Sequence, residues 1–86
     1  MADGKIACKV IFFAAAAQAI QCREMDVTID FDATAGEVFD LLAENCEQLK
    51  KLSSVCAFAI DGHIAKRNTT LHEGCTVAIL PPVSGG

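Results

Sequence analysis

The chain has 86 residues, 52% of them apolar, and a formal net charge of −4, which together predict one small acidic domain. An acidic surface disfavours nucleic acid and anionic membranes as partners. The longest apolar run, 10–17, is shorter than the ~20 residues of a transmembrane helix, and residues 1–4 lack the features of a signal peptide, so we expect a cytosolic protein.

The first third of the chain predicts two strands separated by a short helix. Apolar residues alternate with other residues over 5–13 and, most regularly, over 25–31, as in strands with one buried face. Between them, 14–20 is rich in alanine and favours a helix, which is too short to be stable without packing.

A second helix is predicted from residue 34 to about residue 45. Thr34 and Glu37 have capping-box spacing, in which each side chain accepts a hydrogen bond from the main-chain N–H of the other residue. The helical repeat then turns one apolar face inward, comprising Ala35, Val38, Leu41, Leu42 and Cys46. Leu49 and Leu52 follow, and we expect them to hold a short connector against the core.

The rest of the body predicts three strands, over 55–60, 63–66 and 75–80. Asp61 and Gly62 predict a type I′ hairpin turn, because both tolerate positive φ, and 71–74 predicts a second tight turn. Two strands, a helix and three further strands favour an α+β fold with the helix across one face of a sheet. The predicted core comprises Val10, Phe12, Val27, Ile29, Val38, Leu42, Phe58, Ile60, Val77 and Ile79.

The end of the sequence predicts a reactive tail, residues 81–86, on a folded body, residues 1–80. The tail consists of Pro81, Pro82, Val83, Ser84, Gly85 and Gly86. The prolines favour a stiff extended path, and the glycines, which have no Cβ, can thread a slot too narrow for a side chain. The main-chain carboxylate of Gly86 is therefore the predicted reactive group. The alternative is a frayed terminus without chemistry.

Cysteine and histidine give no sign of a metal site. The cysteines are Cys8, Cys22, Cys46, Cys56 and Cys75. Their odd number and the lack of CxxC spacing fit neither a disulfide framework nor a zinc site, so we expect reduced, structural thiols. Cys22, in a predicted loop, is the one to test for reactivity. His63 and His72 lie in or beside turns and are predicted to be solvated.

Three segments resemble the sulfur-carrier small subunits of molybdopterin synthase, a ubiquitin-like β-grasp family. They are 9–14, 58–62 and 71–86, and the last, which ends in PPVSGG, is the most specific. The resemblance implies a mixed sheet of about five strands in which the last strand pairs in parallel with the first. The chain departs from the family at 15–17, where the family often has charged residues, and at Cys75, where it often has aspartate.

The resemblance also implies a function. An ATP-dependent, ubiquitin-activating-type adenylyltransferase would adenylate the carboxylate of Gly86, and a sulfur donor would convert it to a thiocarboxylate. The sulfur would pass to a cyclic pyranopterin precursor in a pocket of the large catalytic subunit, within a heterotetramer holding two copies of each subunit. The carrier itself would bind no cofactor or metal and would not be an enzyme on its own.

Other functions remain open at this point. Related carriers for thiazole synthesis or tRNA thiolation also end in two glycines. A ubiquitin-like modifier would use the same activated carboxylate of Gly86 but join it to a lysine of a target protein. A plain binding module would have a terminus without chemistry.

The β-grasp topology predicts where a partner binds. Because side chains alternate along strands, the face away from the helix would gather Ile11, Phe13, Ala59, Ala78 and Leu80. Exposed apolar residues gathered in this way usually mark an interface. We therefore predict that these five residues contact the large subunit.

Overall fold

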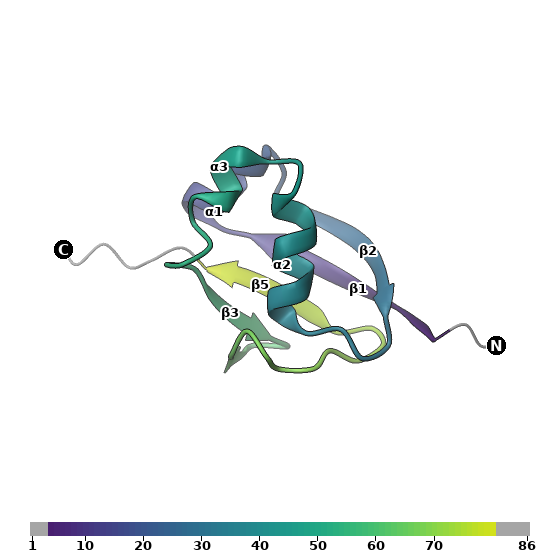
Figure 1. The fold of residues 1–86 in the computed structure, drawn as a ribbon. Coiled ribbons are helices and arrows are strands. Elements are labelled where there is room, and N and C mark those ends of the chain that lie inside the picture. Colours follow the sequence, from purple (N-terminus) through teal and green to yellow (C-terminus); the bar gives the residue numbers. More distant parts are fainter. Residues whose placement is uncertain (1–3, 81–86) are drawn as a thin grey trace.

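In a computed structural model, residues 4–80 are described, and the predicted tail, 81–86, lies outside the described residues. The elements are β1 (Lys5–Phe12), α1 (Ala14–Ile20), β2 (Glu24–Asp30), α2 (Ala35–Ala43), α3 (Glu47–Lys50), β3 (Ala57–Ile60), β4 (His63–Ala65) and β5 (Thr76–Leu80). Figure 1 shows α2 lying across one face of the sheet, which has five strands. The predicted α+β architecture is confirmed.

The strand order of the sheet is β2-β1-β5-β3-β4, so the last strand in the sequence lies at its centre. β5 runs parallel to β1, with Val10 opposite Val77. It runs antiparallel to β3, with Phe58 opposite Ile79. The remaining pairs, β1 with β2 and β3 with β4, are antiparallel. The parallel pairing that the family resemblance implied is therefore present.

The core fills the space between the sheet and α2. Seven of the ten predicted core residues are buried, namely Val10, Phe12, Ile29, Val38, Phe58, Val77 and Ile79. Val27, Leu42 and Ile60 are partly buried and pack against them. The Phe39 and Phe58 rings meet edge to face with their centroids 5.9 Å apart, which joins α2 to β3.

The beginning of α2 matches its prediction, but one residue of its inner face does not. The Glu37 N–H donates to Thr34 Oγ1 (3.3 Å) and the Thr34 N–H donates to the Glu37 carboxylate (2.9 Å), so the capping box is confirmed. The prediction that Leu41 faces the core is wrong, because its side chain is 53% exposed. Phe39, which the predicted face omitted, is fully buried instead. The helix ends at Ala43, slightly earlier than predicted.

Six strand ends differ from the predicted ranges by one or two residues, and three of these differences have a visible cause. Phe13 caps α1 with an extended backbone instead of continuing β1. Phe31 is exposed, because the chain turns after Asp30, whose carbonyl accepts from the Ala33 N–H (3.0 Å). β3 begins two residues late, since the N–H groups of 55 and 56 both donate to the Leu52 carbonyl in the turns after α3.

The hairpin turn between β3 and β4 is as predicted. Asp61 and Gly62 have φ values of 52° and 86°, and Ile60 lies opposite His63. Both central residues therefore have the positive φ of a type I′ turn. This turn fixes which residues of β4 face each side of the sheet, and the candidate site depends on that register.

Candidate functional site

The predicted tail follows directly from the central strand of the sheet. β5 ends at Leu80, between Phe12 of β1, which lies opposite Ile79, and Ala57 of β3, which lies opposite Leu80. A strand with hydrogen-bonded neighbours on both sides is held more firmly than an edge strand. The roles predicted for Pro81, Pro82, Val83, Ser84, Gly85 and Gly86 concern residues outside the described part of the chain and stay predictions.

Beside the end of β5, the face of the sheet away from α2 carries an apolar surface. The five residues predicted for it lie together, because Ala78 of β5 is opposite both Ile11 of β1 and Ala59 of β3. Phe13 and Leu80 continue the same face by one further row. Phe13 is 45% exposed, Ile11, Ala78 and Leu80 are half-buried, and Ala59 is buried.

Ile64 of β4 belongs to this surface and was missed from the sequence. It lies opposite Ala59 and is 77% exposed, the most exposed large apolar side chain in residues 4–80. The sequence did contain the information needed to find it. A two-residue turn at 61–62 pairs Ile60 with His63 and therefore Ala59 with Ile64. We call the set Ile11, Phe13, Ala59, Ile64, Ala78 and Leu80 the outer apolar patch.

Main-chain hydrogen bonds to β5 and to α1 hold Phe13 in position. Its N–H donates to the Ile79 carbonyl (3.3 Å), and its own carbonyl accepts from the Ala16 N–H (3.0 Å) as α1 begins. The next residue, Ala14, has a φ of 48°, so the chain reverses sharply here. Phe13 is thereby held beside the last residue of β5 at the edge of the outer apolar patch.

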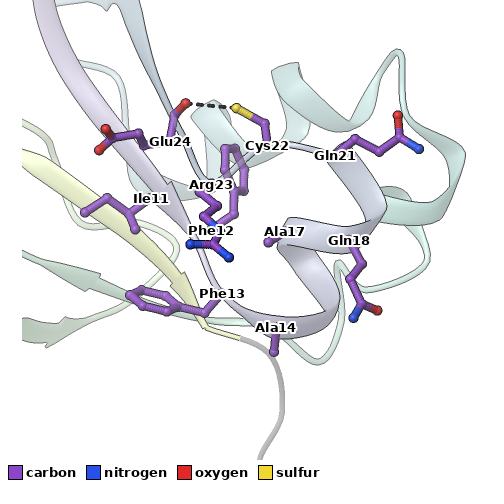
Figure 2. A pocket seen from close by; sticks show the side chains of 10 residues that line it. All are labelled: Ile11, Phe12, Phe13, Ala14, Ala17, Gln18, Gln21, Cys22, Arg23 and Glu24. Carbon is purple, nitrogen blue, oxygen red and sulfur yellow. Dashed lines mark hydrogen bonds between the residues drawn. The ribbon is translucent and has the colours of Figure 1, made fainter.

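A hollow of about 920 Å³ adjoins the patch between β1 and α1, as Figure 2 shows. Ile11 and Phe13 belong to both the hollow and the patch, and Ala14 and Ala17 extend the apolar lining along α1. Cys22 lies at its rim, where the thiol donates to the Glu24 carbonyl (2.8 Å). The apolar part of the lining therefore extends the outer apolar patch along α1.

Two of the other cysteines form a buried pair. Cys8 Sγ and Cys75 Sγ are 3.2 Å apart, and all five cysteines are free thiols. Burial, together with the hydrogen bond to Cys75, raises the pKa of the Cys8 thiol from 9.0 to about 12. Burial also raises the pKa of Cys56. Such thiols are poor nucleophiles at neutral pH, which supports the structural role predicted for Cys8 and Cys56.

The histidines lie beside the hairpin turn at Asp61, near the start of β5. His72 Nε2 is 3.0 Å from the Asp61 carboxylate, and both side chains are exposed. His63 Nδ1 lies 3.2 Å from the Asp61 carbonyl oxygen. Residues 4–80 contain no group of three His, Cys, Asp or Glu side chains that could hold a metal ion. In the same residues, no helix is long and apolar enough to cross a membrane.

Comparison with known sequences matches nearly the whole chain. The ThiS family profile matches residues 10–86. The molybdopterin synthase sulfur carrier subunit of Caenorhabditis elegans is 30% identical over 83 residues, which cover 94% of this chain and 99% of that protein. The subunit of the same name from Caenorhabditis briggsae is 29% identical with the same coverage.

Solved structures share the fold. SAMP1 from Haloferax volcanii has a TM-score of 0.76 and 28% identity, covering 93% of this chain and 99% of that one. A chain in the complex of subunits 1 and 2 of molybdopterin-converting factor from Helicobacter pylori has a TM-score of 0.67 and 32% identity, covering 94% and 100%. Caldiarchaeum subterraneum ubiquitin, at 17% identity and a TM-score of 0.64, supports the fold alone. The predicted ubiquitin-like β-grasp fold is confirmed.

Proposed function

The chain belongs to the ThiS family, and from this membership we propose that it is a sulfur carrier of molybdopterin synthesis that carries sulfur on the carboxylate of Gly86. The observation that carries the proposal is the match to molybdopterin synthase sulfur carrier subunits over 94% of the chain. The PPVSGG ending supplies the carboxylate and the narrow stem that such a role needs.

The chemistry resides in a single main-chain group. A carboxylate oxygen of Gly86 attacks the α-phosphorus of ATP and pyrophosphate leaves, which gives an acyl adenylate. A sulfur nucleophile at the oxidation level of hydrosulfide then attacks the carbonyl carbon, the bond to the AMP oxygen breaks, and a thiocarboxylate remains. Activation is needed because a free carboxylate is a poor electrophile. A separate ubiquitin-activating-type adenylyltransferase supplies it, and the carrier binds no ATP or other cofactor of its own.

Delivery of the sulfur takes place in a partner. The thiocarboxylate enters a pocket of the large subunit, where its sulfur displaces an oxygen substituent from a carbon of the pyranopterin precursor. Water then cleaves the bond between that sulfur and the Gly86 carbonyl carbon, which restores the carboxylate and leaves the sulfur on the precursor. The Helicobacter pylori neighbour is part of a complex of subunits 1 and 2, which supports a partner of this kind. We propose the same pairing here, in a heterotetramer with two copies of each subunit.

The outer apolar patch suits a carrier whose sulfur is delivered inside a partner protein. It surrounds the end of β5, so a partner that takes up the tail also covers apolar side chains such as Phe13 and Ile64. Burying them adds binding free energy at about 25 cal/mol for each Å² of apolar surface. The patch fixes the position of the folded body, and the tail then sets the depth to which Gly86 reaches.

The test is ATP-dependent loading followed by mass spectrometry of the intact chain. The parent protein, incubated with an activating enzyme, ATP and a sulfur donor, should exchange one oxygen for sulfur. Deleting Gly86 should abolish loading, because the carboxylate withdraws by about 3.3–3.6 Å and active sites tolerate misplacement of only about 1 Å. Gly85→Val and a one-residue extension after Gly86 should also fail.

Deleting Ala2 is the matched control, since it shortens the chain by one residue at the other end and should leave loading intact. Thermal melting should be the same for all these variants. Loading of the Gly86 deletion to the level of the parent would show that the carrier reading is wrong.

A protein modifier is the second candidate, because SAMP1 from Haloferax volcanii, a small archaeal modifier protein, is 28% identical over 93% of this chain. A modifier would form an isopeptide bond between the Gly86 carbonyl and a lysine of another protein. Purifying the protein from its own cells and weighing every species separates the two. A thiocarboxylate supports the carrier, whereas conjugates without a thiocarboxylate support the modifier.

A further inference from the structure

β2 is an edge strand whose outer side has unpaired main-chain groups. The Phe12 N–H donates to the Arg23 carbonyl (2.9 Å), and the Phe31 N–H donates to the Gly4 carbonyl (2.7 Å). In an antiparallel pair, alternate residues bond to the neighbouring strand, so the odd-numbered residues of β2 bond to β1. Asp26 and Thr28 therefore point their N–H and C=O groups away from β1, where residues 4–80 place no further strand.

The two faces of this edge differ in character. On the α2 side, Ile29 is buried and Met25 and Val27 pack against the core. A hollow of about 410 Å³ lies between β2 and α2, and its lining includes the apolar Ile29, Val38 and Leu41 as well as the charged Lys5, Asp30, Asp32 and Glu37. Leu41 is 53% exposed, and Phe31, just past the end of β2, is 63% exposed. An apolar side chain placed beside β2 on this face would find apolar neighbours.

The opposite face of β2 is acidic. Glu24, Asp26 and Asp30 alternate along it. Lys9 Nζ is 3.7 Å from Glu24, and Lys5 Nζ is 2.7 Å from Asp30. Within residues 4–80, no ion pair engages Asp26, which lies between them. Lys9 lies opposite Asp26 in the pairing of β1 with β2, and its ammonium group pairs with Glu24 instead. The three carboxylates outnumber these two lysines, so a cation placed beside β2 on this face would be attracted to it.

We propose that the free edge of β2 is a docking site for an extended segment of a partner protein in which large aliphatic residues alternate with lysine or arginine. Such a segment adds a sixth strand by main-chain hydrogen bonds to Asp26 and Thr28. Side-chain alternation then places its aliphatic residues between β2 and Leu41 and its basic residues beside Asp26.

Two other occupants fit less well. A second copy of this chain, pairing through its own β2, would set acidic side chains against acidic ones, which is destabilising. The edge at the other side of the sheet, β4, has only three residues and offers few bonds. The outer apolar patch reaches β1 at Ile11, opposite Glu24, whereas Asp26 and Thr28 lie further along β2, opposite Lys9 and Ala7, so a strand bound there leaves the patch open. The proposal therefore does not depend on the function proposed above.

The test uses the full-length protein and a short synthetic peptide that alternates isoleucine and lysine. We expect saturable binding, with NMR chemical-shift changes at Asp26, Thr28 and Leu41 and none at Phe13 or Ile64. A peptide of the same composition with its lysines and isoleucines in separate blocks should bind at least about tenfold more weakly, because it cannot present one basic and one apolar face.

Variants at Thr28 supply matched controls, since its outward N–H and C=O take no part in the pairing with β1. Thr28→Lys should weaken binding about tenfold by placing a like charge beside the peptide, whereas Thr28→Glu should preserve or strengthen it. Thr28→Pro removes the outward donor without breaking the ladder and should also weaken binding.

Several outcomes would overturn the proposal. They are no binding of the alternating peptide, equal binding of the block peptide, shifts centred on the outer apolar patch, and equal affinities of Thr28→Lys and Thr28→Glu. A concentration-dependent dimer that uses β2 would assign the edge to a second copy of the chain instead. If Thr28→Pro fails to fold, the Lys and Glu variants still decide the outcome.

Discussion

At the scale of single residues, the buried thiols show how a reactive group becomes a packing residue. Cys8 lies on β1 and Cys75 lies just before β5, with 4% and 1% of their surface exposed. Their sulfur atoms lie 3.2 Å apart and face the core. Sulfur transport through Gly86 needs no side-chain thiol, which agrees with this environment. Cys75 belongs to the core cluster of buried residues, so its thiol acts there as a packing group.

The raised pKa of Cys8 predicts a loss of stability at alkaline pH. Below pH 9 the thiol is protonated in both the folded and the unfolded chain. From pH 9 to about 12 the unfolded chain releases the proton and the folded chain keeps it, so the free energy of unfolding falls as pH rises. Urea midpoints should therefore fall more steeply over this range in the parent than in Cys8→Ala. Identical slopes would contradict the prediction.

A second prediction at this scale concerns sulfur loading. A version in which all five cysteines are replaced by alanine or serine should still acquire sulfur on Gly86, provided that it folds. The measurement is intact-mass analysis after loading, with the fold checked by circular dichroism. Loss of loading on changing Cys22 alone would point to a persulfide carried on that thiol.

At the scale of elements, α2 shows what a helical pattern can and cannot predict. The capping box was predictable because it depends on two residues at a fixed spacing, Thr34 and Glu37. The inner face was harder to predict because apolar residues surround much of the helix. Each residue advances about 100° around the axis, which places Leu41 roughly 120° from the centre of a face that includes Phe39. Sequence alone did not show that Phe39 is the residue that meets Phe58.

This difference predicts unequal effects of two substitutions in α2. Phe39→Ala should lower the free energy of unfolding by about 3–5 kcal/mol, the usual cost of emptying a buried aromatic site. Leu41→Ala should change it by less than about 0.5 kcal/mol, since its side chain is mostly exposed. Urea denaturation of both variants checks the prediction. If Leu41→Ala lowered the free energy of unfolding more than Phe39→Ala does, α2 would bury a different face from the one in the structure.

At the scale of the whole molecule, the sequence predicted the elements better than their arrangement. Alternating residues and turns gave all five strands, but nothing in the residues themselves paired β5 with β1. That pairing came from the family resemblance, because residues distant in sequence meet only through the topology. The outer apolar patch depends on it, since Ala78 joins Ile11 and Ala59 only when β5 is central. Ile64 was missed because the alternation of faces along β3 was not extended through the turn at 61–62 to β4.

The patch predicts which substitutions separate binding from folding. Leu80→Asp and Ile64→Asp should each weaken binding to the large subunit by about tenfold or more while leaving the melting temperature nearly unchanged. Leu41→Asp, an apolar-to-acidic change on the other face, should bind like the parent. Titration calorimetry with the large subunit measures all three. Unchanged affinity of the two patch variants would show that the partner contacts another surface.

The central parallel pair also determines how the fold bears mechanical load. The chain enters β1 at Lys5 and leaves β5 beside Phe13, at opposite ends of the pair, as Figure 1 shows. A force applied beyond Leu80 therefore acts along the axis of β5, and its hydrogen bonds to β1 and β3 are sheared together instead of opening one after another. Resistance to such a force depends on the unfolding rate and not on equilibrium stability. The folded body should therefore keep its shape under a force that pulls along β5.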